Sequence, residues 1–93
     1  MKITRRLVIH GRVQGVGYRY AMVAVARRLS VTGWVRNRRD GSVEAMVQAS
    51  PASIGHLSEW AKRGPDGASV KGIDIFDIED AEIYTDFRQV PTL

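Results

Sequence analysis

The order of apolar and polar positions divides the chain into short segments with two different periods. Residues 3–10 contain the β-branched run Leu7-Val8-Ile9, which predicts a strand. From Tyr18 onward the apolar spacing becomes helical, and it predicts a helix of about three turns. The apolar face of this helix consists of Met22, Val25, Ala26 and Leu29.

The middle of the chain has the pattern of a β-hairpin. Residues 33–38 predict one strand, and residues 42–48 predict the next. In the second of these, Val43, Ala45 and Val47 alternate with more polar side chains, as in a strand with one buried face. Asp40-Gly41 lies between the two strands, and both residues tolerate the positive φ that a tight hairpin turn requires.

A second helix is predicted to begin at Ser50-Pro51, because serine can cap a helix and proline suits its first position. We expect this helix to end at Gly64-Pro65, with Gly64 in the left-handed conformation. Its apolar stripe comprises Ile54, Leu57 and Ala61, with Trp60 beside them.

Two further strands are expected in the last part of the chain. The longer one covers residues 70–78, where the apolar phase slips between Ile75 and Phe76; this predicts a bulge or burial on both sides at that point. Residues 83–90 predict a short final strand. The order β-α-β-β-α-β indicates an α+β fold of the ferredoxin-like, split βαβ type, with an antiparallel sheet and two helices on one face.

Composition narrows the possible functions. The 93 residues, 44% of them apolar, suffice for one core, so we expect a single domain over 1–93. The absence of cysteine excludes disulfides, thiolate metal sites and a cysteine nucleophile. Only three apolar residues follow the basic pair Arg5-Arg6, so we expect a cytoplasmic protein with no membrane partner. The net charge of +4 fits either an anion-binding surface or a solvated basic one.

The candidate chemistry lies in the glycine-rich segment from Gly11 to Arg19. Its three glycines, at positions 11, 15 and 17, permit a tight turn with backbone N–H groups pointing inward. The helix that follows adds free N–H donors and the positive end of its dipole. The positive charge of Arg19 is unfavourable at the positive end of that dipole, so its presence there indicates an anion nearby. A guanidinium can hold two phosphate oxygens at once. The spacing matches neither the dinucleotide-binding nor the Walker motif, which leaves a phosphate loop and a plain glycine connector both open.

The same segment resembles the signature of the acylphosphatases, small enzymes that hydrolyse the carboxyl–phosphate bond of acyl phosphates. Gly33-Trp34-Val35-Arg36-Asn37 is similar to the second motif of that family, and Asp40-Gly41 matches its hairpin turn. Gly64-Pro65, followed by Ala68 and Val70, resembles a third pattern. The likeness covers nearly the whole chain, with the motifs in the order that the family has.

The resemblance implies a role for each site residue. Arg19 would bind the phosphate oxygens and Asn37 would orient the attacking water, as the two catalytic residues. It implies a small acyl phosphate as substrate, inorganic phosphate or a similar anion as product or inhibitor, and no metal or organic cofactor. A monomer is expected at this size. The phosphate-binding loop would be formed by Gly11, Arg12, Val13, Gln14, Gly15, Val16, Gly17, Tyr18 and Arg19.

Two other functions fit the same order of elements. An RNA-binding module of the RRM type shares it and would suit a basic chain, but it carries stacking aromatic residues on its two central strands. Residues 6–10 and 43–48 contain no aromatic residue, and the RNP1 pattern is absent, so we expect no nucleic-acid partner. A non-catalytic regulatory domain of this fold is disfavoured by the presence of both Arg19 and Asn37.

Overall fold

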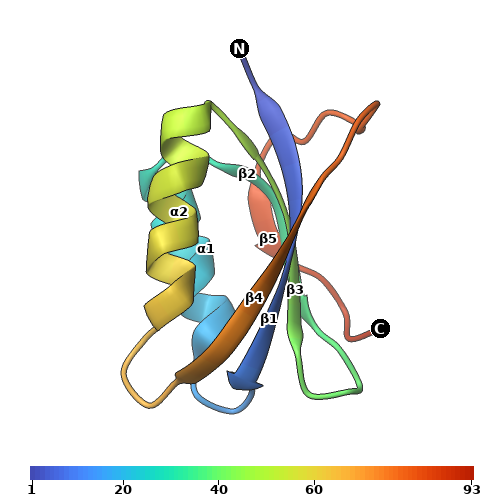
Figure 1. Cartoon of the computed structure of the whole chain (residues 1–93). Coiled ribbons are helices and arrows are strands. Elements are labelled where there is room, and N and C mark those ends of the chain that lie inside the picture. The colour runs from blue at the N-terminus through green and yellow to red at the C-terminus, as the bar shows by residue number, and fades with distance from the viewer.

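Five strands and two helices follow one another along residues 1–93, all of which the computed structural model describes. Their order confirms the predicted β-α-β-β-α-β arrangement, to which a short fifth strand is added (Figure 1). The elements are β1 (Ile3–Arg12), α1 (Tyr18–Arg28), β2 (Thr32–Asn37), β3 (Val43–Ala49), α2 (Pro51–Arg63), β4 (Ser69–Asp77) and β5 (Phe87–Gln89).

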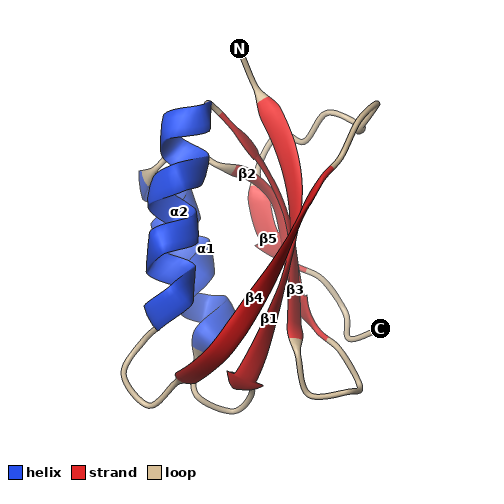
Figure 2. Ribbon diagram, viewed as in Figure 1, coloured by secondary structure: helices blue, strands red, loops and turns tan.

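The strands form one sheet in the order β4-β1-β3-β2-β5. β1 pairs antiparallel with β3 and β4, and β2 pairs antiparallel with β3. The prediction of an antiparallel sheet therefore holds for four strands, whereas β5 runs parallel to β2. The chain leaves β4 at one edge and crosses to the opposite edge, where β5 enters in the direction of β2. Both helices lie against one face of the sheet, as Figure 2 shows, and the other face is left open.

The hydrophobic core fills the space between the sheet and the two helices. Alternate residues of β1 and β3, such as Leu7, Ile9 and Val43, are fully buried there. Met22 from α1 and Leu57 from α2 pack against them from the opposite side. Burial of each such side chain contributes about 1.5–3 kcal/mol to folding. Neither helix has the length and apolar composition that a membrane span requires.

The ends of α2 follow the predicted signals with one difference. Ser50 caps the helix, since its hydroxyl oxygen accepts a hydrogen bond from the Ser53 N–H at 3.2 Å, and Pro51 occupies the first turn. Gly64 has the expected positive φ of 70°, but its ψ of −170° is extended rather than left-handed helical. A Cβ atom at Gly64 would lie 2.7 Å from the ring of Tyr18, so close packing against that ring also requires glycine here.

The predicted irregularity of the fourth strand lies elsewhere. Ile75 and Phe76 pair regularly with β1, and both remain partly exposed, so neither a bulge nor two-sided burial occurs at that point. The register instead shifts between His10 and Gly11, where β4 contributes one residue, Lys71, that has no partner. β4 is an edge strand, and for this reason its apolar pattern carries little information about burial.

The final strand is shorter than predicted. Only residues 87–89 of the predicted 83–90 are in β5, and Phe87 is their one buried side chain. The preceding connection is attached to the sheet by the buried side chain of Gln48 in β3. Its amide nitrogen donates to the Glu82 carbonyl at 3.0 Å, and its amide oxygen accepts from the Tyr84 N–H at 3.1 Å.

Candidate active site

The glycine-rich segment begins in β1 and ends at the first turn of α1. Gly11 and Arg12 are the last residues of β1, so the loop proper comprises residues 13–17. Val13 is buried in the core, and it fixes the start of the loop. Gly15 and Gly17 have φ values of 74° and 79°, the left-handed region that other residues rarely adopt. The predicted tight turn is therefore present.

The first turn of α1 lies directly behind this loop. Gly17 is its N-terminal cap and supplies no capping side chain, and the first turn contains no acidic residue. Its backbone N–H groups therefore point out of the helix without a side-chain partner, at the positive end of the helix dipole. The Arg19 side chain is half-buried in this turn and forms no ion pair or hydrogen bond within the protein. An anion can bind at such a helix start.

Asn37 lies at the end of β2, on the face of the sheet that the helices cover. It pairs with Val43 of β3, which in turn pairs with Ile9 of β1. Val43 and Ile9 are both fully buried under the helices, and side chains directly opposite one another across strands share a face. The amide oxygen of Asn37 is buried and receives no hydrogen bond from the protein. A buried acceptor of this kind requires a partner from outside the protein chain.

The loop and the β2–β3 hairpin both lie at the lower end of the sheet in Figure 1. The side chain of Gln14 joins them directly. Its amide nitrogen donates to the backbone carbonyls of Arg38, at 2.7 Å, and of Ser42, at 2.9 Å. The structure thus joins the loop that precedes Arg19 to the hairpin that follows Asn37.

The one aromatic residue of the glycine-rich segment, Tyr18, packs in the hydrophobic core. Tyr18 is 1% exposed, and its hydroxyl donates to the Ala61 carbonyl of α2 at 2.7 Å. Its ring centroid lies 5.3 Å from that of Trp60. Burial raises the pKa of the Tyr18 phenol, which therefore stays protonated as a hydrogen-bond donor. Only the backbone of Tyr18 is available to a ligand at the loop.

His10, next to the loop, and Asp40, close to Asn37 in sequence, are each paired with another side chain or turn residue. His10 lies on the open face, where its ring Nε2 contacts the Asp74 carboxylate at 2.9 Å. Asp40 accepts hydrogen bonds from the hydroxyl and the backbone N–H of Ser42, and these bonds lower the pKa of its carboxyl group. Asp40 therefore stays ionised and stabilises the hairpin turn. Neither group is arranged to exchange protons with a ligand at the loop.

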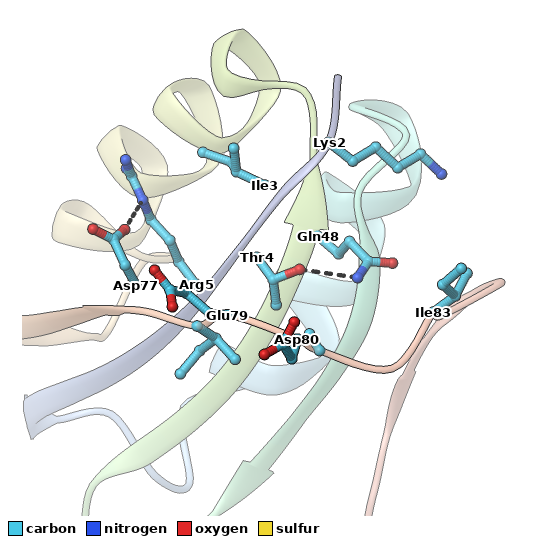
Figure 3. Close-up of a pocket in the computed structure, with 11 residues that line it drawn as sticks. Lys2, Ile3, Thr4, Arg5, Gln48, Asp77, Glu79, Asp80 and Ile83 are labelled. Carbon is cyan, nitrogen blue, oxygen red and sulfur yellow. Dashed lines mark hydrogen bonds and ion pairs between the residues drawn. The ribbon is translucent and has the colours of Figure 1, made fainter.

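The largest cavity of the molecule lies at the opposite end of β1 from the loop. It has a volume of about 730 Å³ and lies between the start of β1 and the segment after β4 (Figure 3). Arg5 forms an ion pair with Asp77 at 3.0 Å on one side of it. On another side, Gln48 donates to the Thr4 hydroxyl at 2.9 Å. The cavity contains none of the predicted site residues.

Two features of the site were not predicted from the sequence. The bridging role of the Gln14 side chain depends on carbonyl groups 24 and 28 residues further along the chain, and no local pattern indicates them. The buried state of the Asn37 amide oxygen depends on its position in the row with Val43 and Ile9. The only sequence signal for it is a polar residue two positions after the buried Val35 in one strand.

Comparison with known proteins assigns this architecture to a family. The acylphosphatase family model matches residues 5–89. Acylphosphatase 1 of Ralstonia nicotianae is 46% identical over 98% of this chain and 90% of its own length, and the acylphosphatase of Bordetella avium is 53% identical over 73% and 72%. The crystal structure of the acylphosphatase from Bacillus subtilis superimposes with a TM-score of 0.92, at 32% identity, over 95% of this chain and 98% of that one. The structure of an acylphosphatase from Coxiella burnetii gives 0.91 at 35% identity, over 96% and 93%. The chain is therefore an enzyme of the acylphosphatase family.

Proposed function

We propose that this enzyme hydrolyses acyl phosphates by holding the phosphate group in the loop of residues 11–17 and directing a water molecule at it from Asn37. Hydrolysis of the carboxyl–phosphate bond is the activity of the family to which the chain belongs. The observation that supports the proposal is that the loop before Arg19 and the hairpin after Asn37 are joined at one end of the sheet by the Gln14 side chain. The unpaired guanidinium of Arg19 can bind an anion, and the unpaired amide oxygen of Asn37 can accept from a water.

Arg19 and the backbone amides of the loop and the first helical turn bind the phosphate group. The amides of the loop and of the first helical turn donate to its oxygens, and the helix dipole favours its negative charge. Arg19 adds a planar pair of donors that can reach two oxygens at once. These groups also stabilise the charge that spreads over the phosphoryl oxygens in the transition state.

Asn37 supplies the alignment of the nucleophile. Its amide oxygen accepts a hydrogen bond from water and holds the water in line with the bond to be broken. The water oxygen forms the new bond to phosphorus while the carboxylate departs with the bonding electrons. Both protons of the water end on the inorganic phosphate, which is the second product. A carboxylate is a weakly basic leaving group, so no strong general acid is needed. This agrees with the state of His10 and Asp40, which are both paired elsewhere.

The open face of the sheet does not favour the RNA-binding alternative. β1 and β3 are the two central strands that flank each other in the sheet, and neither contains an aromatic residue. Two basic side chains of that face, Arg6 and Arg36, both donate to the buried carboxylate of Glu44. Both guanidinium groups are thereby held by one carboxylate within the protein, which makes them less available to a nucleic-acid backbone.

We also propose that the enzyme acts as a cytoplasmic monomer, without a nucleic-acid or membrane partner. The loop, the helix start and the strand end that form the site all belong to one chain, which supports a monomer. Sedimentation at the concentration used for the activity assay tests this. A monomeric species with full activity is expected, and activity confined to a larger species would overturn it.

The hydrolysis of benzoyl phosphate in EDTA tests the proposed roles. Arg19→Ala and Asn37→Ala are each expected to fold normally and to lose about 3–4 kcal/mol of transition-state stabilisation, which is about 100- to 1000-fold in kcat. Arg28→Ala, at the other end of α1 and fully outside the site, is the matched control and should retain wild-type turnover. Wild-type turnover in either site variant would refute its assigned role.

A further inference from the structure

Gln14 is the one residue of the loop whose side chain forms a hydrogen bond with the β2–β3 hairpin. Its two acceptors, the carbonyls of Arg38 and Ser42, belong to the residues next to Asn37 and to its partner Val43. The amide nitrogen of Gln14 thus spans the hairpin at the pair directly beyond Asn37. Its neighbour Val13 is buried in the core, so the loop backbone at Gln14 is fixed in place on one side of the contact, and the hairpin is fixed on the other.

The hairpin does not need Gln14 to satisfy its own backbone. The Ser42 carbonyl also accepts from the Arg38 N–H at 2.9 Å, and the Arg38 carbonyl also accepts from the Gly41 N–H at 3.1 Å. Asp40 further fixes the turn through its two hydrogen bonds with Ser42. Loss of the Gln14 amide would therefore leave no buried carbonyl without a partner. What it would remove is the connection between the loop and the hairpin.

We infer that Gln14 is a positioning residue, whose side-chain amide sets the distance between the phosphate loop and the Asn37 side chain. The inference rests on the proposed function, in which the loop binds phosphate and Asn37 aligns the water. Alignment of this kind is sensitive to small errors, since a misplacement of about 1 Å can cost about 100-fold in rate. Gln14 makes no contact with the reacting atoms in this account; it acts through the placement of Asn37.

The substitution Gln14→Met tests the inference because methionine has a similar length and no hydrogen-bond donor. We expect kcat for benzoyl phosphate to fall about 10- to 100-fold, while the affinity for inorganic phosphate, measured by calorimetry, changes less than about twofold. Phosphate affinity should be retained while kcat falls, because the loop amides and Arg19, which bind phosphate, are left in place. An unchanged kcat, or a parallel loss of phosphate affinity, would overturn the inference.

Gln48→Met is the matched control. Gln48 also joins separate elements through its side-chain amide, but it lies beside the cavity at the far end of the sheet (Figure 3). Both variants are expected to melt at a lower temperature than the wild type, and only Gln14→Met is expected to lose kcat. An equal loss of kcat in Gln48→Met would mean that the effect is one of general stability, and would overturn the inference.

A double-mutant cycle with Asn37→Ala separates this inference from the proposed function. If Gln14 acts through Asn37, then Gln14→Met causes no further loss of the residual activity in the Asn37→Ala background. Additive losses would overturn the positioning role while leaving the role of Asn37 intact. Wild-type activity in Asn37→Ala alone would refute the proposed function, and with it the inference.

Discussion

Replacement of Gly11 by alanine perturbs the point where β1 and β4 approach each other at the entrance to the loop. Gly11 has a φ of 123°, and a Cβ atom there would lie 2.2 Å from the Ser69 carbonyl oxygen and 2.8 Å from the Lys71 nitrogen. Both neighbours are backbone atoms in the bulged pairing of β1 with β4. No rotation of a side chain can relieve the contact, so the two strands have to separate.

The expected cost has two parts. A residue other than glycine held at such a φ loses about 1–3 kcal/mol, and overpacking against a fixed neighbour costs about 1–3 kcal/mol more. We therefore expect Gly11→Ala to lower the free energy of unfolding by about 2–6 kcal/mol, a large share of the 5–15 kcal/mol that is typical of a domain.

Urea denaturation followed by tryptophan fluorescence measures this change, with Gly55→Ala as the control. Gly55 lies within α2, is exposed, and has no atom within 4 Å of a Cβ built on it. Alanine should stabilise the helix there by about 1 kcal/mol. A Gly11→Ala protein as stable as the wild type would show that the close contact with β4 does not require glycine at position 11. So would a loss in Gly55→Ala of the same size, because the effect would then not depend on the contact with β4.

Two further predictions concern buried polar groups. Glu44→Gln should lower the free energy of unfolding by about 1.5–3 kcal/mol at neutral pH, because Glu44 accepts from Arg6 and Arg36. Burial acts to raise the pKa of Glu44, but these hydrogen bonds more than offset it, so its pKa is lower in the folded protein. The stabilisation is therefore complete above the ordinary carboxyl pKa of about 4.3, and it is lost as the pH falls through the lower pKa of the folded protein. The difference in Tm between Glu44→Gln and the wild type should shrink toward acid pH, and a constant difference would contradict this prediction. Tyr18→Phe should cost about 1 kcal/mol, or about 4–8 °C in Tm, through loss of the hydrogen bond to the Ala61 carbonyl, and an unchanged Tm would exclude that contribution.

The regular part of the fold could be predicted from the sequence because local patterns determine it. The apolar spacing of α1 follows from its single buried face. The alternation in β3 follows from one face that lies in the apolar core, but Glu44 and Gln48 on its other face are buried as well, so the predicted single buried face is wrong for this strand. β4 was less predictable, since an edge strand buries little on either side. Phe76 is 44% exposed, and the Arg6 guanidinium lies 5.1 Å from its ring centroid, so an aromatic residue that suggests burial is covered by a cation instead.

Features that depend on distant parts of the chain could not be predicted. The bulge at Lys71 results from the pairing of β4 with the end of β1, and the parallel direction of β5 results from its crossing to the edge beside β2. In the site, too, some features follow from the local sequence and others depend on distant parts of the chain. The glycine positions and Arg19 follow from the loop sequence, whereas the joining of the loop to the hairpin that follows Asn37 depends on a sheet order in which β3 lies between β1 and β2.

Calorimetry of inorganic phosphate binding to Arg19→Ala, beside the wild type and Arg28→Ala, is the decisive test of whether Arg19 helps the loop to bind phosphate. Phosphate binding needs no turnover, so it reports on the loop and Arg19 separately from the role of Asn37. Loss of a charged hydrogen-bonding partner costs about 1.5–3 kcal/mol, and we therefore predict that Arg19→Ala binds phosphate about 10- to 100-fold more weakly than the wild type, with Arg28→Ala unchanged. Equal phosphate affinity in Arg19→Ala and the wild type would exclude Arg19 from the phosphate site.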